Sequence, residues 1–338
     1  MKNKDDILKL FNEFNQQKVL IIGDVMIDSY LWGNVERMSP EAPVPIVSVH
    51  EKVDRLGGAA NVAMNIKALG ATPIICSVIG KDAKGKEFIN LLDKRGLSKS
   101  GIVISSNRKT TTKFRIFGNK SQIIRVDEET TTDLSKDDFE QLKKHINDIF
   151  DIIKIDIIIF QDYDKGVINT DLIDMIFKKS RNLNIPVVVD PKKKNFYAYK
   201  NFDFFKPNLK ELKEGLNLDF NHRNIDELSK AAQLLKEKIN IGMIMITLSE
   251  DGVYISNDTE RHLIPAHIRA ISDVSGAGDT VISLAALCLA LKLPPEEIAY
   301  ISNIAGGLVC EEVGVVPINK DKLLKEIERL SDWNLNCL

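Results

Sequence analysis

The segment Asp273-Val274-Ser275-Gly276-Ala277-Gly278-Asp279-Thr280, DVSGAGDT in one-letter code, is the feature around which this chain of 338 residues is organised. Its two glycines and its alanine leave the turn without bulky side chains, and an apolar helical run follows at residues 281–291. Such a turn lets backbone N–H groups converge at a helix N-terminus, where the helix dipole favours an anion. Asp279 lies in the first turn of that helix, so the pattern is typical of a base that faces a phosphate during phosphoryl transfer. Taken alone, however, the segment is explained better by a tight glycine turn at a helix start.

The composition is that of an ordinary globular enzyme, with 44% hydrophobic and 28% charged residues. The formal net charge of -2 gives no reason to expect nucleic acid or an anionic membrane surface as a partner. No apolar run approaches the ~20 residues of a membrane span, and the acidic start MKNKDDILKLFNEF does not suit a secretory signal. The four cysteines are scattered without a CxxC pair, which predicts reduced thiols in a cytoplasmic protein and no zinc site.

Short apolar runs alternate with amphipathic stretches along most of the chain. The run Val19-Leu20-Ile21-Ile22, ended by Gly23-Asp24, is typical of a buried parallel strand. Further strands are expected at residues 73–79, 155–160, 186–189, 202–205 and 243–247, with a hairpin at 253–256 and 261–264. Helices are expected at residues 5–16, 57–69, 84–95, 135–150, 170–182, 208–215, 224–239, 279–292, 295–312 and 319–330. This alternation predicts an α/β fold with a doubly wound, mostly parallel sheet, in a single domain that spans residues 1–338.

Two segments, at about residues 30–56 and 108–127, do not follow this alternation. The first contains three prolines and short alternating runs such as Ile46-Val47-Ser48-Val49, and the second has the turn Gly118-Asn119-Lys120 between two such runs. Both patterns are typical of exposed β-hairpins. We therefore expect a small inserted β-sheet that acts as a lid, as a dimer surface, or as both.

Polar residues follow several of the expected strands. In a parallel sheet the carboxyl ends of the strands meet at one edge, where open α/β sheets bind their ligands. The residues beyond these ends include Asp28, Lys165, Lys192, Asn208, Glu211, Thr247 and Gly252. Asn208 and Glu211 stand three apart at a helix start, so both side chains can face one Mg²⁺ or its waters. A helix whose first turn carries a carboxylate for the dipole is the competing explanation.

Two glycine-containing segments call for opposite interpretations. Gly57-Gly58-Ala59-Ala60-Asn61 opens a helix, where small residues permit close backbone approach and Asn61 can bond to a polyol. Residues 80–87 (GKDAKGKE) fit the P-loop pattern GxxxxGK, but Glu87 stands where a P-loop needs Ser or Thr for Mg²⁺. Because Asp82 would also repel a phosphate, we reject the second segment as a phosphate site.

With GGAANVA near its start and DVSGAGDT near its end, the chain closely resembles the ribokinase-like (PfkB) family of carbohydrate kinases. The resemblance implies a doubly wound α/β body with a β lid, and ATP and Mg²⁺ as cofactors. It implies that Asp279 is the catalytic base, and that Gly276, Ala277 and Gly278 form the anion hole for the transferred phosphoryl group. Asn208 and Glu211 match the NxxE element of the family, which organises Mg²⁺ through water. The implied ATP contacts are Asn208, Glu211, Thr247, Gly252, Gly278 and Asn303.

Within that family the chain looks most like the heptose 7-phosphate kinases, above all in the segment SPEAPVP at residues 39–45. This implies ATP-dependent phosphorylation of the anomeric hydroxyl of D-glycero-β-D-manno-heptose 7-phosphate, giving the 1,7-bisphosphate for ADP-heptose and lipopolysaccharide core synthesis. Such kinases are often fused to an adenylyltransferase, and because no HxGH motif occurs here we expect a stand-alone kinase. Gln161 and Asp164 stand where small residues or glycine are expected, and Ser249 stands where Gly is common.

The resemblance also implies that Asp28, Gly57, Gly58 and Asn61 hold the sugar. Its phosphate needs cations, and the alternatives are Arg37, Lys113, Arg115, Lys165, Lys192 and Lys193. Exposed apolar residues in the lid predict a homodimer that forms through the lid. These residues are Val44, Ile46, Val47, Phe114 and Ile116. A kinase of the same family that acts on another sugar or a nucleoside is the main alternative, and an inactive sugar-binding scaffold is a more distant one. The anomer, the nucleotide preference and a monovalent-cation requirement are left open.

Overall fold

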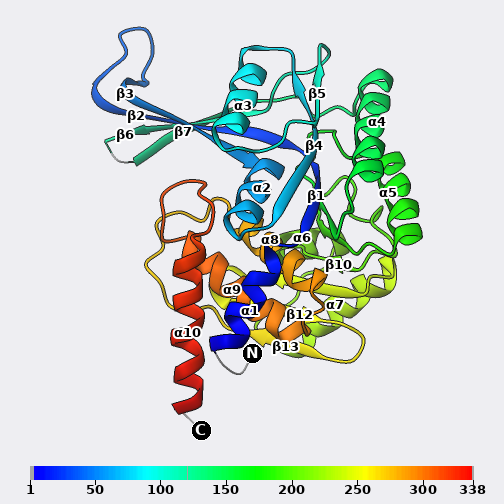
Figure 1. Cartoon of the computed structure of the whole chain (residues 1–338). Coiled ribbons are helices and arrows are strands. Elements are labelled where there is room, and N and C mark those ends of the chain that lie inside the picture. Colours follow the sequence, from blue (N-terminus) through cyan, green and yellow to red (C-terminus); the bar gives the residue numbers. More distant parts are fainter. Residues whose placement is uncertain (1–3, 120, 337–338) are drawn as a thin grey trace.

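The computed structural model of the chain describes residues 4–119 and 121–336. Figure 1 shows helices packed around a large sheet, with a second, smaller sheet projecting from this body. The large sheet has nine strands in the order β13-β12-β11-β10-β9-β8-β1-β4-β5. These strands are β1 (Lys18–Gly23), β4 (Thr72–Gly80), β5 (Gly101–Ser105), β8 (Ile157–Gln161), β9 (Val187–Asp190), β10 (Phe204–Phe205), β11 (Met243–Thr247), β12 (Val253–Ser256) and β13 (Arg261–Ile264).

Neighbouring strands from β11 to β5 are parallel, whereas β12 and β13 add to the β11 edge in antiparallel fashion. The apolar run of β1 explains its central place. Val19 and Ile21 lie in one hydrophobic core, Leu20 lies in the core on the other face, and all are 0% exposed. A strand buried on both faces has no need for polar alternation. The predicted doubly wound, mostly parallel α/β fold is therefore confirmed.

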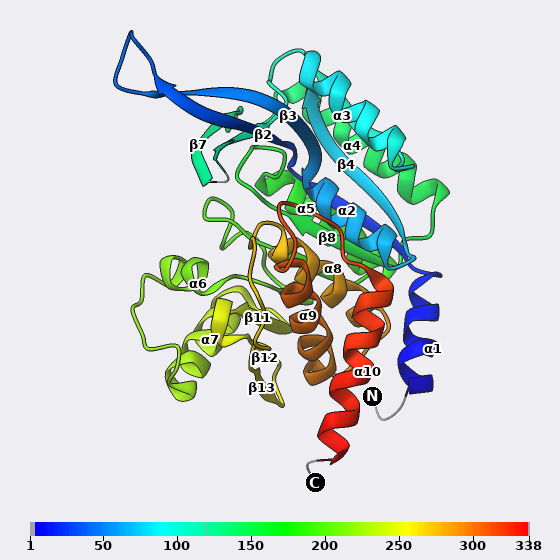
Figure 2. The same ribbon diagram turned by 90° about the vertical axis from the view of Figure 1, so that its left-hand side faces the viewer.

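The helices cover both faces of this sheet. One core is closed by α1 (Lys4–Phe14), α2 (Ala59–Ala68), α3 (Ala83–Lys94), α8 (Ala277–Ala290), α9 (Pro295–Val309) and α10 (Lys320–Asn336). The other core is closed by α4 (Lys136–Ile152), α5 (Thr170–Leu183), α6 (Leu209–Leu216) and α7 (Ile225–Ile239). The first and last helices, α1 and α10, lie side by side (Figures 1 and 2). No helix in residues 4–119 and 121–336 has the length and apolar character that crossing a bilayer requires.

The smaller sheet, called the lid from here on, lies where the sequence predicts an inserted β-sheet. Its strands, in the order β3-β2-β6-β7, are β2 (Val25–Met38), β3 (Pro45–Gly58), β6 (Thr112–Gly118) and β7 (Ser121–Glu128). Figure 2 shows β2 and β3 extending well beyond the body. Both strands reach deeper into the body than the expected segment at 30–56, so that Asp28 lies within lid strand β2 instead of in a turn after β1. Strand β5 was not expected, although glycines and serines at residues 96–101 mark a turn before its short apolar run Ile102-Val103-Ile104.

Candidate active site

The carboxyl edge of the parallel strands and the start of α8 come together around one carboxylate, that of Asp279. This residue lies in the first turn of α8 and is 4% exposed. Asn61 Nδ2 lies 2.8 Å from Asp279 Oδ2, while Tyr163 Oη and Gln161 Nε2 lie 2.6 and 3.1 Å from Asp279 Oδ1. The three donors come from α2, from the loop after β8 and from the last residue of β8. Segments more than 100 residues apart in the sequence therefore fix both oxygens of this carboxylate.

Burial raises the pKa of Asp279 from an ordinary 3.8 to about 6. The hydrogen bonds from Tyr163 and Asn61 lower this pKa, the negative charge of Asp190 raises it, and the positive charge of Lys206 lowers it. A general base works best when its pKa lies near the working pH, where it is ionised and still holds a proton well. The environment of Asp279 thus suits a base at neutral pH.

A buried ion pair lies next to this carboxylate. Lys206 directly follows β10 and is 3% exposed, and its Nζ lies 3.1 Å from Asp190 Oδ2. Gln161 Nε2 lies 3.2 Å from the same oxygen, so the amide connects Asp279 to the ion pair. Sequence reasoning assigned no role to Lys206 or Asp190. The sequence signal for a role was their position, since Asp190 ends one strand and Lys206 directly follows another. Many solvated loop residues have the same kind of position, so this signal does not single them out.

The turn before α8 has the features of an anion site. Gly276 has a φ of 85°, a left-handed conformation that favours glycine, and it precedes the first helical residue. Among the described residues, no side chain caps this helix start. The first amides of a helix lack intrahelical acceptors and are the groups that can bind an anion. At this helix start the Ala277 N–H already donates to the Val274 carbonyl oxygen at 3.3 Å. Lys206 Nζ lies 3.8 Å from the position that a Cβ atom on Gly278 would take, which adds a positive charge beside the turn.

The expected sugar-binding residues gather between this turn and the lid. Gly57 lies against Asp28, because a Cβ on Gly57 would fall 2.0 Å from Asp28 Oδ2. A Cβ on Gly276 would fall 2.9 Å from Asn61 Nδ2. Gly58 has a φ of 61° and starts α2. The glycines therefore leave room for the side chains of Asp28 and Asn61. Contact of these residues with a sugar stays a prediction.

Most of the candidate cations are already paired with carboxylates. Lys165 Nζ lies 2.8 Å from Glu129, and Lys113 Nζ lies 3.3 Å from Asp127. The other two pairs are Lys192 with Glu211 and Arg115 with Asp28. Arg37 is exposed on the outer part of β2, away from this cluster. The structure thus brings Lys113 and Arg115 close to the sugar side and leaves Arg37 apart.

Asn208 and Glu211 form a capping box at the start of α6. The Asn208 side chain accepts from the Glu211 N–H at 2.8 Å, and Glu211 Oε2 accepts from the Asn208 N–H at 2.8 Å. The other Glu211 oxygen accepts from Lys192. Within the described chain, no three His, Cys, Asp or Glu side chains form a metal-binding group. Because both Glu211 oxygens are engaged, the pair fits a hydrated Mg²⁺ held through its waters, not a directly coordinated ion.

The expected ATP contacts form two groups. Thr247 ends β11 and makes a parallel bridge with Asn208, which places it beside the capping box. Gly252 has a φ of 95°, and a Cβ on it would fall 2.1 Å from the Ile264 carbonyl oxygen. Asn303 on α9 donates to the Pro265 carbonyl oxygen at 2.8 Å. Gly252 and Asn303 therefore contact the same segment at the end of β13.

Asp24 holds the loop that carries Tyr163, and sequence reasoning gave it no role. Its carboxylate accepts the backbone N–H groups of Tyr163, Lys165 and Val167 at 2.9, 3.1 and 3.1 Å. Burial raises the pKa of Asp24, while these N–H donors lower it. The loop is thereby fixed to the end of β1, which keeps the Tyr163 hydroxyl on Asp279.

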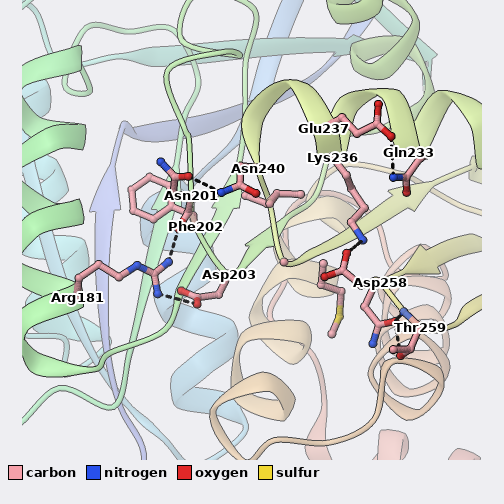
Figure 3. A pocket seen from close by; sticks show the side chains of 14 residues that line it. Arg181, Asn201, Phe202, Asp203, Gln233, Lys236, Glu237, Asn240, Asp258 and Thr259 are labelled. Atoms are coloured by element: carbon pink, nitrogen blue, oxygen red, sulfur yellow. Dashed lines mark hydrogen bonds and ion pairs between the residues drawn. The ribbon is translucent and has the colours of Figure 1, made fainter.

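A pocket of about 730 Å³ lies away from this site, where α5 and α7 end and β11 begins (Figure 3). Its arginine and its lysine each pair with an aspartate. Arg181 lies 2.9 Å from Asp203, and Lys236 lies 2.7 Å from Asp258. The dashed lines in Figure 3 join these groups across the pocket wall. We therefore place the chemistry at the carboxyl edge of the sheet, where donors converge on a single carboxylate.

Comparison with known proteins agrees with the fold described above. Among solved structures, phosphofructokinase-2 from Escherichia coli in complex with potassium superposes with a TM-score of 0.76 at 18% identity, covering 94% of this chain and 99% of that one. Arabidopsis thaliana ribokinase complexed with ribose and ATP gives 0.70 at 18% identity, covering 91% and 99%. At such identities these structures show the shared fold.

Relatives of similar sequence include the bifunctional protein HldE of Helicobacter pylori strain J99, 39% identical over 88% of this chain and 64% of that protein. HldE of Aliarcobacter butzleri strain RM4018 is 37% identical over 94% of this chain and 66% of that protein. The chain thus spans slightly less than two thirds of the length of these relatives. The model of the pfkB family of carbohydrate kinases matches residues 16–322. The chain therefore belongs to the pfkB family and is an ATP-dependent carbohydrate kinase.

Proposed function

We propose that this kinase phosphorylates the anomeric hydroxyl of D-glycero-β-D-manno-heptose 7-phosphate, giving the 1,7-bisphosphate used in ADP-heptose synthesis. The observation that carries the reaction type is the buried Asp279, fixed by three donors beside an uncapped helix start. The choice of sugar is supported by the SPEAPVP segment of the lid and by the relatives named HldE. An inactive scaffold has no need of a buried carboxylate, whose desolvation is costly.

In this proposal Asp279 accepts the proton of the sugar hydroxyl as the phosphoryl group is transferred. Asn61 and Tyr163 hold the carboxylate in one orientation, and Oδ2, which accepts from Asn61, has a further lone pair for the proton of the sugar hydroxyl. The amides of Gly276, Ala277 and Gly278, together with Lys206, supply positive charge where negative charge develops. ATP with Mg²⁺, when bound, supplies the phosphoryl group and neutralises its charge.

The phosphate of the sugar is assigned to Lys113 and Arg115. In register, Asp28 lies opposite Lys113, and Lys113 lies opposite Asp127, so these side chains share one face of the lid. Arg115 already contacts Asp28 on that face. A phosphate dianion binds Lys and Arg more strongly than a single carboxylate does, so it can take over these cations. Arg37 lies nine residues beyond Asp28 along β2, about 30 Å in an extended strand, and is too distant to share the substrate.

We also propose that two chains associate through the lid. Ile124 and Val126 of β7 are 52% and 46% exposed, and Val49 of β3 is 48% exposed. Ile124 pairs in register with Ile116, and Val126 pairs with Phe114, so they share the face opposite Lys113 and Arg115. Apolar side chains on a projecting sheet are typical of an interface that a second copy covers.

One assay tests the proposed reaction. The purified chain is incubated with ATP, Mg²⁺ and, separately, heptose 7-phosphate, fructose 6-phosphate, ribose, fructose or adenosine, and ADP release is followed by a coupled reaction. The expected result is turnover with heptose 7-phosphate alone at low substrate concentration, with a new anomeric phosphate in the phosphorus NMR spectrum. Preference for another acceptor would overturn the substrate assignment. Absence of ADP release with every acceptor would overturn the reaction as well.

A further inference from the structure

Gln161 is the residue at the site that departs most clearly from the small residues expected after this strand. It is the last residue of β8 and is 1% exposed. Its backbone is fixed, because its carbonyl oxygen accepts from the Asp24 N–H at 3.1 Å. Gly23 of β1 permits this close packing, since a Cβ there would fall 2.0 Å from the same oxygen. The side chain therefore leaves a rigid strand end and points into the site.

The orientation of the Gln161 amide follows from its neighbours. Nε2 donates to Asp279 Oδ1 at 3.1 Å and to Asp190 Oδ2 at 3.2 Å. The reverse orientation would put Oε1 against two carboxylate groups, which accept hydrogen bonds and cannot donate when ionised. Nε2 therefore donates to Asp279 and Asp190, and Oε1 points away from both carboxylates.

That acceptor end has no partner. Gln161 Oε1 is buried and accepts no hydrogen bond from any residue within 4–119 and 121–336. Buried polar atoms are nearly always bonded, so an unpaired carbonyl oxygen marks a place where a donor is missing. Because Oε1 and Nε2 belong to one planar group, the unpaired oxygen lies within a few ångströms of the carboxylate of Asp279. A donor that satisfies it stands next to the reacting hydroxyl.

We propose that Gln161 determines which sugar is accepted, with Oε1 accepting a hydrogen bond from the hydroxyl on the carbon next to the reacting carbon. The inference rests on the proposed transfer to a sugar hydroxyl at Asp279. One amide then bonds to the substrate and to the base at once, so that binding of the correct sugar also orients Asp279. A sugar without the neighbouring hydroxyl leaves Oε1 unpaired and is rejected, as in other sites that bind a substrate hydroxyl.

The test compares kcat/KM for two substrates in the unaltered chain and in variants at two positions, Gln161 and Gln17. The substrates are the preferred sugar phosphate and its analogue that lacks the neighbouring hydroxyl. Gln161→Met removes both donor and acceptor at nearly constant volume. Gln17→Met is a matched control, because Gln17 Oε1 is also buried without a partner among the described residues. Gln17 lies at the opposite edge of the sheet, where its carbonyl oxygen accepts from the Thr72 N–H at 2.9 Å.

The unaltered chain is expected to lose about 10- to 100-fold in kcat/KM with the deoxy analogue, the range for a missing partner of a buried acceptor. In Gln161→Met the loss should shrink to less than about twofold, because the analogue no longer leaves an acceptor unpaired. Gln17→Met should keep the full discrimination. Unchanged discrimination in Gln161→Met would overturn the proposal, as would discrimination by the unaltered chain of less than twofold.

A second variant keeps the acceptor end and guards against misfolding of the first. Gln161→Glu keeps an acceptor oxygen, while its second oxygen lies against Asp279 and Asp190 and holds a proton there, because neighbouring carboxylates raise the pKa of a buried carboxyl. The variant should therefore retain discrimination against the deoxy analogue, while its turnover falls because a titratable group now lies next to the base. Loss of discrimination in this variant would contradict the role of Oε1. If the unaltered chain prefers an acceptor other than heptose 7-phosphate, the substrate assignment fails by itself. The comparison is then run with that acceptor and its own deoxy analogue, so the two failures are told apart.

Discussion

Replacing Tyr163 with phenylalanine removes one of the three hydrogen bonds to the proposed base and leaves the aromatic ring in place. The Tyr163 hydroxyl donates to Asp279 Oδ1 at 2.6 Å. Burial and the charge of Asp279 hold the pKa of Tyr163 well above its usual range, so the hydroxyl keeps its proton and remains a donor. The bond stabilises the carboxylate form of Asp279 relative to the acid form. Its loss should therefore raise the pKa of Asp279.

The size of this change follows from the strength of the bond. A hydrogen bond to a charged group contributes about 1.5–3 kcal/mol, and one pKa unit corresponds to about 1.4 kcal/mol. The pKa of Asp279, about 6 in the unaltered chain, should rise by about 1–2 units in Tyr163→Phe. The base acts when it is ionised, so activity is lost as the pH falls through this pKa. At pH 7 a pKa of about 7.5 would leave roughly a quarter of the molecules ionised.

The measurement is kcat/KM for the sugar between pH 5 and pH 9.5, with ADP release as the signal. The acid limb should move to higher pH in Tyr163→Phe, and activity should recover toward pH 9. Tyr199→Phe is the matched control, because Tyr199 Oη lies 2.6 Å from Asp162 Oδ2, a buried carboxylate that is not the proposed base. Its acid limb should keep the unaltered position. An acid limb that does not move in Tyr163→Phe, or that moves equally in both variants, would refute the reasoning.

Three further changes test other parts of the site. Asp279→Asn should lower kcat by several orders of magnitude because the base is lost, while sugar binding measured by calorimetry stays within about threefold; near-normal turnover would exclude Asp279 as the base. Asn208→Ala should cost about 1 kcal/mol in the free energy of unfolding by removing a helix cap, as should Asn224→Ala at the start of α7. Only Asn208→Ala should also raise the KM for MgATP. If Asn208→Ala and Asn224→Ala changed this KM equally, Asn208 would act only as a structural cap. Ile124→Asp should convert a lid-mediated dimer to a monomer in analytical ultracentrifugation, whereas an unchanged mass would place any interface elsewhere.

The fold could be predicted from the sequence because its signals are local. The apolar run of β1 predicts a strand, and the glycine turn before α8 predicts a helix start, each from a few neighbouring residues. The strand and the helix both lie where they were expected. The partners of Asp279 could not be predicted in this way. Tyr163 and Asn61 are separated from it by 116 and 218 residues, and no periodic pattern indicates which polar side chains meet across such distances.

The same limit applies to charges. Lys165 and Lys192 follow strands that lead to the site, which made them reasonable ligands for a phosphate. Both are paired with glutamates 36 and 19 residues away, which no local pattern predicts. Their contact with a phosphate stays a prediction. Asn208 and Glu211 show a different limit, because the same sequence pattern fits two roles. A capping box and a metal-organising element both need an Asn and a Glu three residues apart. Only the hydrogen bonds of the folded chain show that both side chains cap α6 while Glu211 also contacts Lys192.

The arrangement of cations around Asp279 explains how one carboxylate remains a useful base. A lysine paired directly with an aspartate lowers its pKa by about 1–3 units, which would return Asp279 to an ordinary, weakly basic carboxylate. Lys206 lies close enough to lower the pKa of Asp279, yet its Nζ is bonded to Asp190 at 3.1 Å. Asp279 is instead held by neutral donors, which orient it and offset only part of the effect of burial. Asp190 thus keeps the positive charge of Lys206 on the side of the proposed anion site, where a transferred phosphate would need it, and away from Asp279, the proposed base.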